Sequence, residues 1–136
     1  MELKYLEPLM KLVAAVCNSG CFGCLAGGNA PTDILRQQIE QTRALTSHPF
    51  AVNLITIAPA YLSHLAMLRE VKVPYIIFAG SFPKEKEVIA AKETGAKVLC
   101  FASTVSIAER MIKFGADAII LEGSEAGGHI GHVSSV

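Results

Sequence analysis

The sequence predicts an α/β protein in which helices cover a parallel β-sheet. Short and almost wholly apolar segments, such as residues 118–121, alternate with segments whose apolar residues recur at helical spacing. The apolar segments begin roughly every 20 to 28 residues, which is typical of βα units with right-handed crossovers. Strands that are apolar on both faces favour a parallel sheet with helices packed against it.

The N-terminal half contains two of the expected strands. The first helix places apolar residues on one face and ends at Gly20. Pro31 suits the first turn of the second helix. Backbone N–H groups in a first turn have no acceptor within the helix, so proline, which lacks an N–H, loses no hydrogen bond there. The expected elements of this half are a helix over residues 8–18, a strand over 22–26, a helix over 31–45 and a strand over 50–55.

The C-terminal half contains a repeated pattern. The segments 94–99 and 114–119 each combine a helix end, a glycine and the start of an apolar strand. Ser103 or Thr104 can cap the helix between them. The expected elements are helices over residues 60–71, 83–93 and 104–113, and strands over 74–78, around 97–99 and over 118–121.

Composition restricts the function. The 136 residues suit one domain, and 51% of them are hydrophobic while 18% are charged. Twelve basic and twelve acidic side chains cancel, so we expect no nucleic-acid or anionic-membrane partner. The apolar runs are far shorter than the roughly 20 residues that span a bilayer. Charges near the N-terminus argue against an export signal, and we expect a cytoplasmic protein.

The four cysteines are expected to be reduced, buried and structural; they are Cys17, Cys21, Cys24 and Cys100. Cys21 and Cys24 have the spacing of half a zinc site or of a redox pair. No second pair with this spacing follows, and a strand would direct the two thiols to different sides.

The number of strands leaves the architecture open. Five strands and five helices fit a five-stranded doubly wound sheet, whereas a closed (β/α)8 barrel needs eight of each. In either arrangement, ligands bind at the carboxyl ends of the strands. The glycine-rich segment 122–131 follows the last strand and therefore lies at that end.

Several residues near the strand ends are candidates for ligand binding. In segment 122–131 the glycines allow close backbone approach and His129 can act as acid or base, although a solvated turn is the alternative. Asn53 lies in an apolar strand and contacts either a ligand or the backbone of a neighbouring loop. Glu122 faces the same crevice or serves as a surface carboxylate. His48 and His64 are expected at the surface.

A classical dinucleotide site is not expected. Gly27, Gly28 and Asn29 follow the first strand, but they do not form the fingerprint, and no ribose-binding acid follows a strand about twenty residues on.

Three segments together resemble the nitronate monooxygenase family, formerly called 2-nitropropane dioxygenase. They are residues 13–23, residues 50–54 and the run from Gly115 to Gly131, of which the Glu-Ala-Gly-Gly-His-Ile-Gly part is the most specific. The order and spacing match from about Leu9 to Val136. FMN-dependent enoyl-acyl-carrier-protein reductase II enzymes belong to the same superfamily.

The resemblance implies a partial TIM (β/α)8 barrel that binds FMN at its C-terminal mouth and acts on a small-molecule substrate. The cofactor-binding residues would be Asn53, Glu122, Gly127 and Gly128. His129 occupies the position of the base that removes the α-proton of a nitroalkane. No metal is implied.

The resemblance also leaves alternatives. Many monooxygenase members have Gln where this chain has Glu122, which leaves room for an enoyl reductase or an NAD(P)H:flavin oxidoreductase. By this resemblance, we expect residues 1–136 to form one incomplete barrel domain without the family's first strand and its last βα units, including phosphate-binding loops. We therefore also consider an inactive segment that acts only through association, with homo-oligomers formed through exposed sheet edges.

Overall fold

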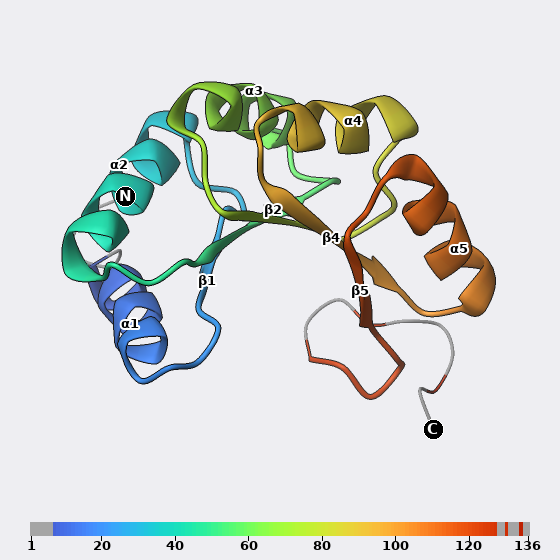
Figure 1. The fold of residues 1–136 in the computed structure, drawn as a ribbon, viewed down its shortest axis with the longest axis horizontal. Coiled ribbons are helices and arrows are strands. Elements are labelled where there is room, and N and C mark those ends of the chain that lie inside the picture. Colours follow the sequence, from blue (N-terminus) through green and yellow to red (C-terminus); the bar gives the residue numbers. More distant parts are fainter. Residues whose placement is uncertain (1–6, 128–129, 131–133, 135–136) are drawn as a thin grey trace.

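The computed structural model describes residues 7–127, 130 and 134, and shows helices and strands in strict alternation (Figure 1). The predicted elements are all present, within a few residues at their ends. They are α1 (Glu7–Asn18), β1 (Cys24–Ala26), α2 (Thr32–Leu45), β2 (Ala51–Ile55), α3 (Tyr61–Val71), β3 (Tyr75–Ala79), α4 (Glu85–Glu93), β4 (Lys97–Ala102), α5 (Val105–Phe114) and β5 (Ala118–Leu121).

Strand β1 begins two residues later than predicted. The chain turns at Gly20, whose φ of +85° is left-handed, and Gly23 then packs tightly against α1. A Cβ atom at Gly23 would lie 2.6 Å from the Sγ of Cys17. This close packing delays the extended strand until Cys24.

The sheet is parallel throughout and has the order β1-β2-β3-β4-β5. A doubly wound sheet reverses its strand order at a switch point and carries helices on both faces, and the described residues show neither feature. The five helices lie along the outer, convex side of the sheet (Figure 1). This arrangement is that of a partial (β/α)8 barrel, with five strands forming an open arc.

The hydrophobic core lies between the helices and the outer face of the sheet. Leu25, Val52, Ile76 and Val98 form one row across four strands, and none of them is exposed. The sequence predicted helices over a sheet that is apolar on both faces. In the described part of the chain only the outer face has a helical layer, so the inner face borders the barrel interior.

The amino ends of the strands are joined by polar contacts around Asp117. Both carboxylate oxygens lie 2.7 Å from the Nζ of Lys92, and Oδ2 also accepts the Val98 N–H at 2.7 Å. Partial burial acts to raise the pKa of Asp117, but these hydrogen bonds and the charges of Lys92 and Lys97 outweigh it. The pKa of Asp117 is therefore below its usual range.

The cysteines only partly match their prediction. Cys17 and Cys100 are buried as expected, and burial raises the pKa of Cys100 to about 12. Cys21 and Cys24 are exposed, because the first lies in the turn before β1 and the second begins an edge strand. All four thiols are free, and the described residues contain no cluster of three or more metal-binding side chains. None of the described helices is long and apolar enough to cross a membrane.

Candidate functional site

The carboxyl ends of all five strands meet at one edge of the sheet. Because neighbouring strands are parallel, their following loops converge there, as at the ligand-binding face of a (β/α)8 barrel. Several pockets open among these loops, and two neighbouring ones share Ser81 and Phe82. The candidate site is therefore built mainly from the loops after β2, β3, β4 and β5.

The smaller of these two pockets, which we call the mouth pocket, has a volume of about 180 Å³. Its lining includes Gly80, Ser81, Phe82, Phe101, Ser103 and Glu122. Gly80 has a φ of +89°, and a Cβ atom there would lie 3.1 Å from a methyl carbon of Ile55. Glycine thus allows β3 to turn sharply into the pocket wall.

Glu122 lies where the sequence placed it, at the end of β5. Its backbone N–H donates to the carbonyl oxygen of Ala102 at 3.1 Å, which continues the ladder with β4. The side chain is half-buried and lines the mouth pocket beside Phe101 and Ser103. A carboxylate is thus available to a ligand in this pocket.

Asn53 lies on the inner face of β2, in register with Ala26 and Ile77. The residue is half-buried, and its Oδ1 is shielded from solvent and has no hydrogen-bond partner among the described residues. The neighbouring Gly27 N–H donates to the backbone oxygen of Asn53 at 2.8 Å and so does not satisfy the side chain. Such an acceptor costs roughly 1–3 kcal/mol of stability, which a ligand donor would recover.

His64 corrects a prediction. It is fully buried rather than at the surface, and its Nε2 lies 2.8 Å from the carbonyl oxygen of Ala30. Within the described part of the chain its Nδ1 has no hydrogen-bond partner, and a Cβ atom added at Gly27 would lie 3.5 Å from it. His64 therefore ties α3 to the glycine loop beside Asn53, whereas His48 is exposed as predicted.

The glycine-histidine segment is only partly described. Gly127 is exposed, and a Cβ atom there would meet nothing within 4 Å. Gly128 and His129 lie outside the described residues. The structure therefore brings Asn53 and Glu122 to one end of the sheet, while Asn53 itself does not line the mouth pocket.

Sequence reasoning missed Tyr61 and Glu87. The Tyr61 hydroxyl donates to Oε2 of Glu87 at 3.0 Å, and both side chains are buried. Burial, together with the nearby Glu87 charge, raises the pKa of Tyr61, so the phenol stays protonated. Tyr61, His64, Leu65 and Leu68 follow the i, i+3, i+4, i+7 spacing of one helix face, which was the available signal.

The comparisons with known proteins agree with this geometry. The family model described as nitronate monooxygenase matches residues 9–70 and 55–136. The chain belongs to the nitronate monooxygenase family. A solved structure of FabK from Thermotoga maritima aligns with 92% of the chain at a TM-score of 0.87 and 37% identity, and the alignment covers 40% of that protein.

The chain is also similar to two further proteins, one by structure and one by sequence. Nitroalkane oxidase from Streptomyces ansochromogenes aligns with 90% of the chain at a TM-score of 0.83 and 30% identity, over 45% of its own length. A curated Mycobacterium tuberculosis protein is 33% identical over 92% of the chain and 35% of its own length. It is named (3aS,4S,5R,7aS)-5-hydroxy-7a-methyl-1-oxo-octahydro-1H-indene-4-carboxyl-CoA dehydrogenase. The chain thus spans less than half the length of each of these relatives.

Proposed function

We propose that this chain is part of an FMN-dependent oxidoreductase of the nitronate monooxygenase type. The whole protein would oxidise nitronates or nitroalkanes with O2. The observation that carries the proposal is the buried, unpartnered Oδ1 of Asn53 on the inner face of the barrel arc. In a member of this family, a polar atom kept there at a cost in stability is explained by a cofactor that donates to it.

The described residues fit a flavin. A flavin ring system has a planar apolar surface, an N–H donor and carbonyl acceptors, and its ribityl chain has hydroxyl donors. Asn53 and Glu122 supply side-chain acceptors, while Gly127 leaves space for the backbone to approach a flat ring. When bound, the flavin supplies the electron transfer, and the protein supplies placement.

His129 is the proposed catalytic base, and Gly128 beside it is proposed to contact the cofactor. A nitro group acidifies the carbon next to it, and an imidazole with an ordinary pKa of about 6.5 is suited to remove that proton near neutral pH. Phe82 and Phe101 provide apolar walls in the mouth pocket, which would exclude water from the substrate carbon.

A FabK-like oxidoreductase is the second candidate. It is favoured by the 37% identity to the FabK structure and by the carboxylate of Glu122 in the mouth pocket. The two candidates share the cofactor and differ in the substrate. An association role without catalysis is a third possibility, which the following experiment distinguishes from both.

The experiment is reconstitution with FMN followed by gel filtration of the 136-residue protein. We expect visible flavin absorbance to co-elute with the protein. The His129→Ala variant should keep the flavin and lose nitroalkane oxidation, while His48→Ala, which changes an exposed histidine, should keep both. A colourless protein that cannot be reconstituted contradicts the proposal, and an active His129→Ala variant contradicts the role of the base.

A further inference from the structure

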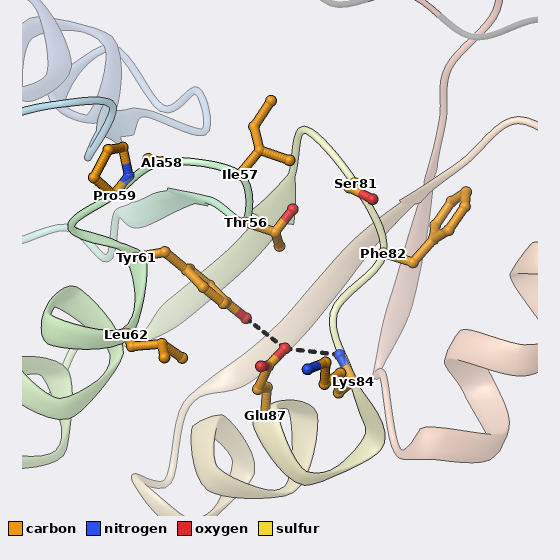
Figure 2. A pocket seen from close by; sticks show the side chains of 10 residues that line it. All are labelled: Thr56, Ile57, Ala58, Pro59, Tyr61, Leu62, Ser81, Phe82, Lys84 and Glu87. Atoms are coloured by element: carbon orange, nitrogen blue, oxygen red, sulfur yellow. Dashed lines mark hydrogen bonds between the residues drawn. The ribbon is translucent and has the colours of Figure 1, made fainter.

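A second pocket adjoins the mouth pocket and takes no part in the function proposed above. It lies between the β2–α3 loop and the β3–α4 loop and has a volume of about 350 Å³ (Figure 2). We call it the outer pocket. Since it shares Ser81 and Phe82 with the mouth pocket, a molecule bound in it would lie directly beside the candidate active site.

The rim of the outer pocket is apolar. Ile57, Leu62 and Phe82 line it, and they are 60%, 63% and 50% exposed, respectively. Large apolar side chains grouped around a concavity are typical of a binding surface rather than of scattered surface residues. The rim is therefore suited to an apolar chain or ring.

The floor of the outer pocket is polar, and its carboxylate is held in place by hydrogen bonds. Glu87 is only 8% exposed, and its Oε2 accepts both the Tyr61 hydroxyl at 3.0 Å and the Lys84 backbone N–H at 2.7 Å (Figure 2). These two bonds fix the carboxylate. Its other oxygen, Oε1, accepts no hydrogen bond from the described residues and is not among the fully buried polar atoms. It is thus available to a donor in the pocket.

Lys84 adds the complementary group. Its exposed side chain lines the same pocket, so both an ammonium donor and the Glu87 acceptor border it. A ligand ammonium would be attracted by Glu87 but repelled by Lys84, and a ligand carboxylate would be attracted by Lys84 but repelled by Glu87, so a charged ligand group gains little net attraction. A neutral secondary amide satisfies both groups, because its N–H can donate to Glu87 while its carbonyl oxygen accepts from Lys84.

We propose that the outer pocket binds an apolar chain that carries a secondary amide. The apolar part contacts Ile57, Leu62 and Phe82, and the amide pairs with Glu87 and Lys84. The inference does not depend on flavin binding. In an enzyme of the proposed type, the outer pocket would hold the remote part of a substrate, while the reacting end of that substrate lies in the mouth pocket.

The test is an NMR titration of the flavin-free protein with three probes that each carry an unbranched chain of five or six carbons: N-hexylacetamide, hexylammonium and hexanoate. We expect the amide to bind at least about tenfold more tightly than either charged probe, with shift changes at Leu62, Glu87 and neighbouring amides. Equal or weaker binding of the amide overturns the proposal, as do shift changes confined to other surfaces.

Two variants test the polar floor and the apolar rim of the outer pocket separately. In Glu87→Gln, the amide oxygen can still accept from Tyr61 and Lys84, but Oε1 is replaced by a donor. We expect about tenfold weaker amide binding. Leu62→Ser tests the rim at an exposed position that folding does not require, with binding weakened about threefold or more.

The matched control is Ile89→Ser, which changes a 46%-exposed apolar residue of α4 outside the pocket and should leave the affinity unchanged. Unchanged affinity in both pocket variants would also overturn the proposal. Since every arm uses flavin-free protein, failure here is distinct from failure of FMN reconstitution.

Discussion

The two ends of the sheet satisfy their polar groups very differently. At the amino end, the Asp117 carboxylate is fully paired with Lys92 and Val98, and the Thr46 hydroxyl donates to Oδ1 of Asn18 at 2.6 Å. At the carboxyl end, Asn53 and His64 each keep a buried atom that finds no hydrogen-bond partner in residues 7–127, 130 and 134. The mouth and outer pockets open only at this second end.

This difference shows how one fold divides stability from function. A fully paired carboxylate stabilises the folded chain, whereas a buried acceptor without a donor destabilises it by roughly 1–3 kcal/mol. The proposed flavin contact would offset this cost at Asn53. The following variants test this division, beginning with the largest expected change in stability.

Asp117→Ala should cause the largest loss. It removes the hydrogen bond to the Val98 N–H and the contact with Lys92, and we expect the free energy of unfolding to fall by about 2–3 kcal/mol. Urea unfolding followed by circular dichroism measures this change. Lys97→Ala is the control, since Lys97 is 3.9 Å from Asp117 and largely exposed, and about 0.5 kcal/mol or less is expected. A loss of stability below about 1 kcal/mol in Asp117→Ala would contradict the stabilising role of this carboxylate.

The lowered pKa of Asp117 makes its contribution to stability sensitive to acid. Because its pKa is lowered by folding, Asp117 contributes its full stability above its ordinary unfolded pKa of about 3.9 and loses it as the pH falls through the lower, folded value. The difference in stability between the natural chain and Asp117→Ala should therefore shrink steadily below about pH 4. Unfolding curves recorded between neutral and acidic pH test this, and a difference that grows on acidification would show that the sign is wrong.

Tyr61→Phe tests a satisfied contact at the carboxyl end. Only one of the two hydrogen bonds to Oε2 of Glu87 is lost, so we expect a decrease of about 0.5–1.5 kcal/mol in the free energy of unfolding. Tyr75→Phe is a suitable control, because the Tyr75 ring packs edge-on against Phe22 and no hydrogen bond of its hydroxyl occurs within the described residues. Equal losses of stability in the two variants would show that the Tyr61–Glu87 hydrogen bond does not stabilise the fold.

Much of the fold could be predicted from the sequence because the determinants are local. Apolar periodicity located every strand and helix, and Thr104 caps α5 as expected, with its side chain accepting the Ile107 N–H. Periodicity alone left the strand order open, because short apolar strands do not specify their neighbours. The resemblance to the family implied a partial barrel, and the singly wound arc of the structure confirms it.

The site was less accessible to sequence reasoning. Glu122 was placed correctly because it directly follows a strand, whereas His64 was wrongly assigned to the surface on residue type alone. Its helical spacing with Tyr61 and Leu65 would have shown that it is buried. The pairing of Tyr61 with Glu87 joins two helices, and no local pattern encodes such a contact.

Asn53→Leu is expected to change stability least. It also tests most directly whether the carboxyl end of the sheet serves ligand binding and the amino end serves stability. Replacing the carboxamide removes an unsatisfied acceptor, so the free energy of unfolding should stay the same or rise by about 1 kcal/mol. Gln38→Leu is the matched control, since it removes another buried, unpartnered oxygen from α2, among the helices.

The decisive measurement is FMN affinity in both variants, recorded beside their unfolding free energies. We predict that Asn53→Leu weakens FMN binding at least about tenfold without loss of stability, and that Gln38→Leu leaves FMN binding unchanged. Unchanged FMN affinity in Asn53→Leu, together with a loss of stability, would contradict the account and make Asn53 a residue that serves the fold.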